Sequence, residues 1–208
     1  MMKVKNKHIV IIGAARSGLA AASLLKRHGA DVFVTDYSEI SGHAKTQLNS
    51  LNIPFEEGGH SIKAEEADFA IISPGVPTES RIVQHYLNTG KDILSEVELA
   101  SGFTELPVVA TTGTNGKTTV TSWIGHTWNI ARQQYAVAGN IGTAFSEVTD
   151  QLQSGHFILE VSSFQLDHIH EFKPFCSLIL NITPDHLDRY QNSFEKYAAA
   201  KFRITENQ

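Results

Sequence analysis

The sequence predicts an α/β fold built from two successive parallel sheets. Three observations predict it: short apolar runs alternate with helical stretches, several runs are apolar throughout, and two glycine-rich turns connect such a run to a helix. Runs that are apolar on both faces are typical of parallel strands covered by helices on both sides. With 208 residues, of which 41% are hydrophobic, the chain can bury the core of one large or two small domains.

Seven strands and four helices are expected. The strands are His8–Ile12, Asp31–Thr35, Phe69–Ser73, Pro107–Thr112, Tyr135–Ala138, His156–Val161 and Cys176–Asn181. The helices are Leu19–His28, Ile82–Asn88, Lys117–Ala131 and Phe194–Ile204. Because strands and helices alternate, we expect crossover connections and therefore parallel pairing. A domain boundary near Ser95 would divide the chain into residues 1–95 and 96–208.

The composition excludes several classes of protein. A formal net charge of −5 disfavours nonspecific binding to nucleic acid or to a membrane surface. Cys176 is the single cysteine, so neither an internal disulfide nor a cysteine-rich zinc site is expected. No apolar run is long enough for a signal peptide or a membrane span, which predicts a soluble cytoplasmic protein. The acidic excess lies wholly in residues 96–208 and favours a Mg²⁺ site there.

The first glycine-rich turn, Gly13-Ala14-Ala15-Arg16-Ser17-Gly18, follows the first expected strand. It departs from the dinucleotide-binding pattern G-x-G-x-x-G at the middle glycine, where Ala15 stands. Asp36 closes the next strand, where such folds place a carboxylate that contacts a ribose or a base. The turn indicates a nucleotide-diphosphate site, and a ligand-free tight turn is the alternative. The turn Ser73-Pro74-Gly75-Val76-Pro77 is expected at the same sheet edge.

The second glycine-rich turn, Gly113-Thr114-Asn115-Gly116-Lys117-Thr118-Thr119, is close to a P-loop. Its spacing is G-x-x-G-K-[ST], with Thr111 where the full pattern requires glycine, and it lies between an apolar strand and a helix. In such a loop, backbone N–H groups surround the phosphates, the lysine reaches the β- and γ-phosphates, and the hydroxyl after it binds Mg²⁺. An incidental glycine-rich turn is the alternative.

Polar side chains also follow two later strands. Glu160 ends the run His156–Val161, and a carboxylate there is costly to bury without a partner such as Mg²⁺; the alternative is a solvent-facing glutamate. The segment Asn181–Tyr190 follows the last expected strand, which Pro184 ends. From the residues alone, Asp185 could equally cap a helix and His186 could equally be a structural histidine.

Four motifs occur in an order that resembles the Mur ligases of bacterial peptidoglycan synthesis. They are Gly113–Thr118, Ala138–Gly142, Glu160–Leu166 and Asn181–Tyr190. The run Ser162-Ser163-Phe164-Gln165-Leu166 is most similar to the members that add D-glutamate. The resemblance covers all 208 residues. It implies a Rossmann-like UDP-binding domain over 1–95, followed by the first part of a P-loop ATPase domain over 96–208.

The resemblance implies a role for individual residues. The ATP-binding residues would be Gly113, Thr114, Asn115, Gly116, Lys117, Thr118 and Thr119. The UDP-substrate-binding residues would be Ala15, Arg16, Ser17, Asp36, Tyr37, Ser73, Pro74, Gly75, Asn140 and Ser162. Mg²⁺ would be bound by Thr118, Glu160, His186 and Lys201, and catalysis would involve Lys117, His186 and Lys201. Lys201 matches a lysine that the family carbamylates; without the resemblance it would be interpreted as an exposed helix lysine.

The activity that the resemblance implies is ATP-dependent, Mg²⁺-dependent amide formation. UDP-N-acetylmuramoyl-L-alanine would be activated as an acyl phosphate, and the amine of D-glutamate would then expel phosphate. We expect a monomer that binds no nucleic acid and does not insert into a membrane. Because the chain ends soon after Lys201 without a Gly or Pro stop signal, we expect a truncated, inactive piece that folds and binds UDP-linked ligand weakly.

Several alternatives remain open. Another Mur ligase, or a ligase similar to folylpolyglutamate synthase, would share most of these motifs. A nicotinamide-dependent oxidoreductase would use Gly13–Gly18 and Asp36 but would leave the P-loop unexplained. A nucleotide-binding module without catalytic activity would use both turns.

Overall fold

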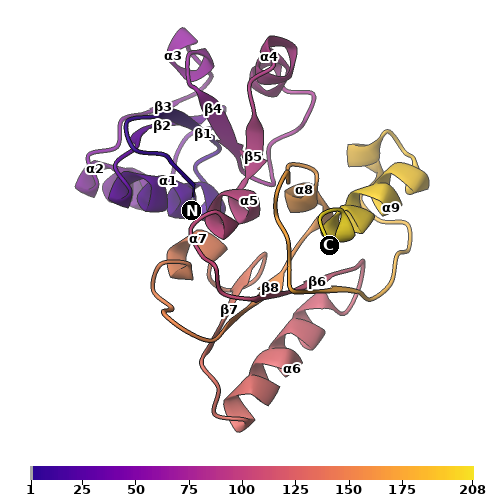
Figure 1. Ribbon diagram of the computed structural model, residues 1–208. Coiled ribbons are helices and arrows are strands. Elements are labelled where there is room, and N and C mark those ends of the chain that lie inside the picture. Colours follow the sequence, from indigo (N-terminus) through magenta and orange to yellow (C-terminus); the bar gives the residue numbers. More distant parts are fainter. Residues whose placement is uncertain (1) are drawn as a thin grey trace.

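The computed structural model describes residues 2–208 and contains two parallel sheets, shown in Figure 1. The first sheet has the order β3-β2-β1-β4-β5. Its strands are β1 (His8–Ile12), β2 (Asp31–Asp36), β3 (Phe55–Glu57), β4 (Phe69–Ile72) and β5 (Ile93–Ser95). The order reverses between β1 and β4, and open α/β sheets bind ligands at such a switch point. Both the first glycine turn and the turn that starts at Ser73 follow these two strands.

The second sheet has the order β7-β8-β6-β9. Its strands are β6 (Val108–Thr112), β7 (Tyr135–Gly139), β8 (His156–Glu160) and β9 (Cys176–Ile179). In the parallel β6–β8 pair, Thr111 lies opposite Glu160. The P-loop begins directly after β6, so this register brings the loop beside the carboxylate that ends β8. The expected α/β fold with a Rossmann-like half and a P-loop half is confirmed.

All seven expected strands and all four expected helices are present. The helices are α1 (Arg16–Arg27), α2 (Gly42–Ser50), α3 (Ile62–Glu65), α4 (Arg81–Thr89), α5 (Glu96–Ser101), α6 (Lys117–Ile130), α7 (Phe145–Val148), α8 (Ser163–Leu166) and α9 (Phe194–Phe202). Short 3-10 turns occupy Leu187–Tyr190 and Arg203–Thr205. The expected start of the first helix was wrong by three residues, because α1 begins inside the glycine turn. No helix between residues 2 and 208 combines the length and apolar character needed to cross a membrane.

Helix α5 contributes to the hydrophobic cores of both sheets. Leu99 packs in the core of the first sheet, whereas Val97 and Ala100 pack in the core of the second. Ser95 ends β5, and its hydroxyl caps α5 by accepting a hydrogen bond from the Glu98 amide at 3.2 Å. The two sheets therefore separate next to Ser95, although the packing crosses that point. The domain boundary near Ser95 stays a prediction.

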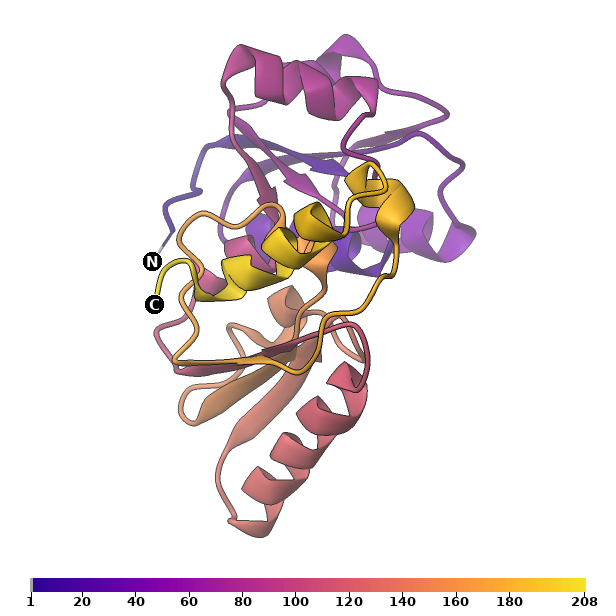
Figure 2. The same cartoon turned by 90° about the vertical axis from the view of Figure 1, so that its right-hand side faces the viewer.

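Arginines join the two halves of the chain. Arg27 of α1 makes a two-pronged ion pair with Asp150, with N···O distances of 3.0 and 3.1 Å. Arg189 donates to the Val76 carbonyl at 2.9 Å, which joins the 3-10 turn to the turn after β4. In Figure 2, α9 crosses in front of the region between the two sheets. Polar contacts between segments far apart in the sequence therefore join the two halves at two places, Arg27 with Asp150 and Arg189 with Val76.

Candidate active site

A cavity of about 660 Å³ lies at the switch point of the first sheet. Seven of the residues expected to bind the UDP-linked substrate line it: Ala15, Ser17, Asp36, Tyr37, Ser73, Pro74 and Gly75. They come from the ends of three strands, which the sheet brings to one edge. The sequence prediction that these residues share a site therefore has a matching cavity, and their role in binding stays a prediction.

Close backbone approach builds one wall of this cavity. Gly13 has a φ of +97°, and a Cβ placed on Gly18 would lie only 2.0 Å from the Gly13 carbonyl oxygen. The buried Ser73 hydroxyl donates to that same carbonyl oxygen at 2.9 Å. Glycine is required at both positions, because a Cβ on Gly13 would lie 2.8 Å from the Ser73 Cβ and one on Gly18 would overlap the Gly13 carbonyl within the same turn. Ala15 occurs where no such contact is needed, as the N-cap of α1 with extended backbone.

Asp36 holds the shape of the first glycine turn. Its carboxylate accepts the Ala14 amide at 2.7 Å and the Ser38 amide at 2.9 Å. Two backbone N–H groups therefore stabilise the negative charge at the cavity edge. Tyr37 next to it is exposed and its ring lies 6.3 Å from that of His60. His60, which the sequence analysis did not single out, lines the cavity and bonds Thr35 at 2.7 Å.

The P-loop is braced against the segment that follows β9. The Asn115 amide donates to the side chain of Asn181 at 2.9 Å, and the Thr114 amide donates to the Asn181 carbonyl. The Thr114 hydroxyl lies 3.0 Å from the Tyr197 hydroxyl of α9. Gly116 has a φ of +83° and precedes α6, so the loop opens directly into the helix N-terminus. A helix N-terminus with free N–H groups is favourable for phosphate.

Glu160 connects the P-loop with the loop after β7. The Thr118 hydroxyl donates to one carboxylate oxygen of Glu160 at 2.7 Å, and the Asn140 side-chain amide donates to the other at 2.9 Å. Glu160 is only 2% exposed. The alternative of a solvent-facing glutamate is therefore wrong. Among residues 2–208, no Lys, Arg or His nitrogen forms an ion pair with it, so only neutral donors face a buried negative charge.

Lys117 and Lys201 donate to the same carbonyl oxygen. Their Nζ atoms each lie 2.9 Å from the Gly113 oxygen, and Lys117 also donates to the Thr114 oxygen at 2.8 Å. Lys201 is 2% exposed, so the alternative of an exposed helix lysine is wrong. Burial, and then the positive charge of Lys117, lower the pKa of Lys201 to about 8. Two lysine side chains thus converge on one backbone carbonyl of the P-loop.

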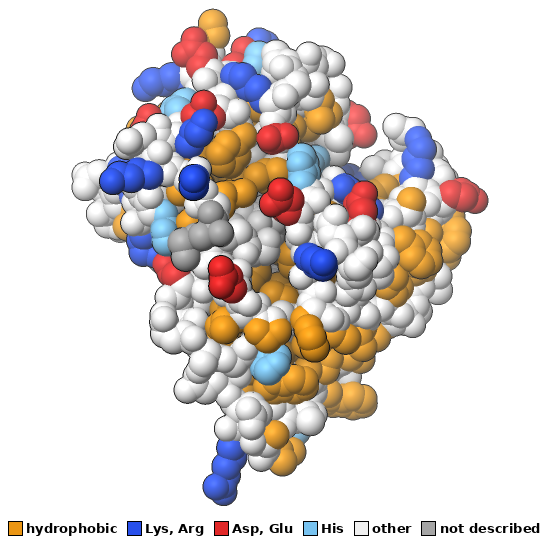
Figure 3. Space-filling view, viewed as in Figure 1, with side chains coloured by type: hydrophobic (Ala, Val, Ile, Leu, Met, Phe, Trp, Pro, Cys, Tyr) orange, Lys and Arg blue, Asp and Glu red, His pale blue; other side chains and the backbone are white. Residues whose placement is uncertain are grey.

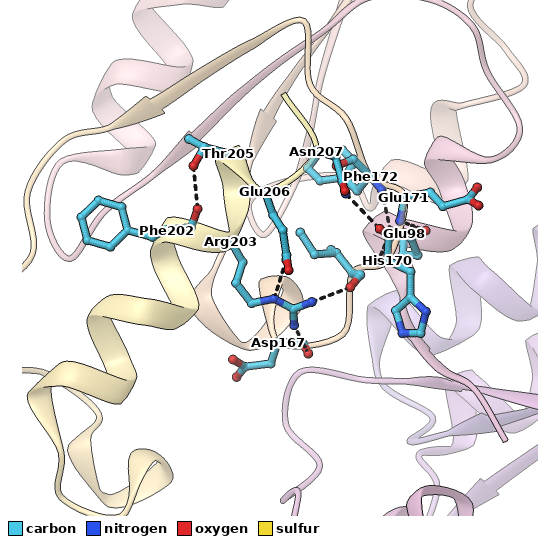
Figure 4. Close-up of polar contacts among 11 residues, drawn as sticks. Glu98, Asp167, His170, Glu171, Phe172, Phe202, Arg203, Thr205, Glu206 and Asn207 are labelled. Atoms are coloured by element: carbon cyan, nitrogen blue, oxygen red, sulfur yellow. Dashed lines mark hydrogen bonds and ion pairs between the residues drawn. The ribbon is translucent and has the colours of Figure 1, made fainter. Parts of the chain in front are cut away.

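A polar network fixes the helix that carries Lys201, as Figure 4 shows. Arg203 donates to the carbonyl oxygen of Asp167 and, at 2.7 Å, to that of Ile169. The buried carboxylate of Glu98 accepts the amides of His170, Glu171 and Phe172, each at 2.9 Å. The loop between α8 and β9 is therefore held from both sides, by α5 and by the end of α9. No local pattern in the sequence predicts these long-range contacts.

Three expected site residues lie outside these two groups. The His186 side chain is 57% exposed, its backbone has a φ of +49°, and its ring lies 5.4 Å from that of Phe164. The Ser162 hydroxyl caps α8 together with Gln165. The guanidinium of Arg16 donates to carbonyl oxygens of the loop after β7 and does not line the cavity. The roles assigned to these residues stay predictions.

A metal site would need ligands beyond the protein side chains. Within residues 2–208, no group of three or more His, Cys, Asp or Glu side chains is arranged to hold a metal ion. Mg²⁺ commonly binds through one or two carboxylates together with substrate phosphates and water. Glu160 and Thr118, which are hydrogen-bonded at the P-loop, fit this mode of binding.

Family models match both halves of the chain. The Mur ligase middle domain matches residues 111–208, and the MurD N-terminal domain matches residues 8–82. The chain belongs to the Mur ligase family. Among curated relatives, the UDP-N-acetylmuramoylalanine–D-glutamate ligase of Salinibacter ruber is 48% identical over 212 residues, which covers 99% of this chain and 46% of the relative. The ligase of the same name from Christiangramia forsetii is 42% identical over 203 residues, again covering 46% of the relative.

Solved structures of Mur ligases share the fold. A UDP-N-acetylmuramate:L-alanyl-gamma-D-glutamyl-meso-diaminopimelate ligase from Neisseria meningitides aligns with a TM-score of 0.61 at 22% identity, over 96% of this chain and 68% of that one. A UDP-N-acetylmuramate–alanine ligase from Thermotoga maritima aligns with a TM-score of 0.58 at 24% identity, over 97% of this chain and 47% of that one. At this level of identity the likeness shows the Mur ligase fold alone.

Proposed function

We propose that these residues belong to an ATP-dependent ligase that adds D-glutamate to UDP-N-acetylmuramoyl-L-alanine. The observation that carries the proposal is the buried Glu160 carboxylate bonded to Thr118 of the P-loop, in a chain 48% identical to a ligase of that name. The chain spans about half the length of the curated relatives it matches. The proposal therefore concerns a protein of their length that contains these 208 residues.

Mg²⁺ and ATP fit the residues of the second glycine turn. A buried carboxylate with only neutral partners is stabilised when a cation binds it. Glu160 and Thr118 would hold Mg²⁺, while the backbone of Gly113–Lys117 would surround the phosphates. When bound, ATP supplies the phosphoryl group that activates the substrate carboxylate.

Lys117 would neutralise negative charge during the reaction, whereas Lys201 would be modified. Both ammonium groups donate to the Gly113 carbonyl, which is a weak partner for two cations. Phosphate oxygens offer a stronger one, so Lys117 would move its charge toward them. Lys201 has an amine with a lowered pKa of about 8, which favours the neutral form that CO₂ modifies. We propose that Lys201 carries a carbamate in the active protein.

The first cavity would bind the UDP end of the substrate. Its position at the switch point, the α1 N-terminus and the Asp36 carboxylate suit a ribose and a diphosphate. A nicotinamide-dependent oxidoreductase would use the same cavity, but nothing in it would require a P-loop. We further propose a cytoplasmic monomer that binds neither nucleic acid nor a membrane.

Phosphate release tests the reaction. A ligase of family length containing these residues should release phosphate from ATP when UDP-N-acetylmuramoyl-L-alanine and D-glutamate are both present, and L-glutamate is the control. Equal release with either enantiomer would contradict the proposal. On the 208 residues alone, UDP should raise the melting temperature more than NAD does, and the reverse order would favour the oxidoreductase. The absence of D-glutamate-dependent release by these residues alone stays a prediction that the same assay checks.

A further inference from the structure

Arg16 extends from the first glycine turn to the second half of the chain. Its two terminal nitrogens donate to the Gly142 carbonyl at 2.6 Å and to the Asn140 carbonyl at 2.9 Å. Ala15 and Ser17, its neighbours in sequence, line the first cavity, whereas the Arg16 side chain does not. One residue of the cavity turn therefore contacts the loop that follows β7.

That loop is closed by one internal hydrogen bond, from the Gly139 amide to the Thr143 carbonyl at 2.9 Å, and its other backbone contacts come from outside it. Gly139 and Gly142 both have positive φ values, +103° and +56°, so the backbone at its two ends is intrinsically permissive. The Asn140 amide donates to the Glu160 carbonyl at 2.8 Å, which fixes one side of the peptide chain. Arg16 fixes the other side through two carbonyl oxygens.

Asn140 passes this constraint to the carboxylate at the P-loop. Its side-chain amide donates to Glu160 at 2.9 Å, and the second oxygen of Glu160 accepts the Thr118 hydroxyl at 2.7 Å. A continuous series of hydrogen bonds therefore runs from Arg16 through Asn140 and Glu160 to the P-loop. Groups that orient a metal-binding carboxylate typically change metal affinity when they are removed.

We propose that Arg16 is a positioning residue that orients Asn140, and through it Glu160, for Mg²⁺ and ATP. This inference rests on the proposed function of the P-loop. A planar guanidinium can hold two carbonyl oxygens at once in a fixed geometry, which a lysine ammonium does with far less directionality. Because Arg16 sits in the cavity turn, it also makes the geometry at the P-loop dependent on that turn.

The chain offers a matched control for this test. Arg27 lies on the same helix and also bridges the two halves, through Asp150, but it has no contact with the series that leads to Glu160. Arg16→Ala and Arg27→Ala each remove one arginine that joins the two halves of the chain. A general loosening of the two halves should affect both variants, whereas positioning of Glu160 should affect only the first.

Two measurements on the 208-residue chain test the proposal. Calorimetry with ATP in saturating Mg²⁺ should show about 10–100-fold weaker binding for Asn140→Ala, the range for lost orienting partners. Arg16→Ala should weaken ATP binding roughly threefold to tenfold. This loss is smaller than that for Asn140→Ala because the Arg16 guanidinium is exposed and screened by solvent. Arg16→Lys should recover part of the loss, and Arg27→Ala should show none. Adding Arg16→Ala to Asn140→Ala should cause little further loss, because the two act in series.

The second measurement needs no nucleotide. In NMR spectra, the side-chain amide signals of Asn140 should shift in Arg16→Ala and stay in place in Arg27→Ala. Unmoved signals, or equal losses of ATP and UDP affinity in Arg16→Ala, would overturn the inference. If a ligase of family length binds no ATP while the Asn140 signals move as expected, the positioning stands and the proposed P-loop function fails.

Discussion

The two glycine turns occupy equivalent places in their sheets, and each lies beside a carboxylate that ends the neighbouring strand. The two carboxylates differ in their hydrogen-bond partners. At the first turn, Asp36 accepts two backbone amides, so its charge is already stabilised by the fold. At the second, Glu160 is buried and bonded only to the neutral side chains of Thr118 and Asn140. At the first turn the backbone itself therefore supplies the partners of the carboxylate. At the second turn, the Glu160 carboxylate has no cationic partner in the part of the chain that the structure describes, while the Lys117 and Lys201 side chains share one carbonyl oxygen. A metal ion would stabilise the carboxylate, and phosphate groups would give the lysine charge a stronger partner.

The helices that follow the two turns differ in how much of their surface is buried. Helix α1 buries Ala20, Ala21, Leu24 and Leu25 and packs against the sheet and α7. Helix α6 buries only Thr121 and Gly125 among its residues and leaves Trp123 and Ile130 exposed. On the face drawn in Figure 3, hydrophobic side chains gather over the second half, whereas charged ones are spread over the first.

Lys117→Ala should abolish most activity. Removing one preorganised cation from a phosphoryl-transfer site should lower D-glutamate-dependent phosphate release by at least about 100-fold in a ligase of family length. Lys173→Ala is the control, because Lys173 is exposed on the same half and distant from the P-loop. Turnover near that of the unaltered protein would contradict the role given to the second turn.

Glu160→Gln should separate function from stability. The Mg²⁺ concentration needed for half-maximal ATP binding should rise by more than about tenfold, because the anionic ligand is lost. The urea midpoint should stay the same or increase, since glutamine keeps a hydrogen-bond acceptor and removes a buried charge. A large loss of stability would show that the carboxylate is satisfied by the fold, and the contrast with Asp36 would disappear.

Asp36→Ala should affect both properties of the first turn. Two backbone amides would lose their acceptor, which should lower the unfolding free energy by about 1–3 kcal/mol in urea titrations. UDP affinity measured by calorimetry should also fall, by roughly tenfold, a change of about 1.4 kcal/mol. Asp31→Ala at the exposed end of the same strand is the control. Unchanged UDP affinity with reduced stability would leave Asp36 a purely structural residue.

Carbamate formation at Lys201 should depend on pH in a defined direction. Only the neutral amine reacts with CO₂, and a pKa of about 8 means that this form becomes more abundant as the pH rises through 8. Between pH 7 and 8 the neutral fraction should increase roughly fivefold. NMR with ¹³C-labelled CO₂ should follow this increase and show no carbamate signal in Lys201→Ala. A signal that survives in that variant comes from another amine.

The sequence predicted the strands that build the two sites but not the short elements around them. Runs such as His8–Ile12 are apolar enough to be recognised, whereas β3 has the sequence Phe-Glu-Glu and β5 has three residues. Helix α2, with the sequence GHAKTQLNS, buries only Ala44 and Leu48, so its periodicity is weak. In such elements tertiary packing decides the structure more than local propensity does.

The site residues divide in the same way. Lys117, Thr118 and Glu160 are recognisable because their motif or strand position announces their chemistry. A role for Lys201 was expected only through the family resemblance, and its burial was not expected, since its local sequence is that of an ordinary helix. The direction of Arg16 could not be anticipated, because its partners lie more than 120 residues away in the chain. Contacts of that kind exist only once both sheets have formed.

Helix α5 determines how the two halves of the molecule unfold. One face of its two turns completes the packing of one sheet, and the opposite face completes that of the other. Separating the halves at Ser95 would leave the first without Leu99 and Phe103, which lie beyond that point. Heat or denaturant that melts one half therefore removes part of the other's interior. We expect the two to unfold in one cooperative transition, which makes this short helix the thermodynamic link between the halves.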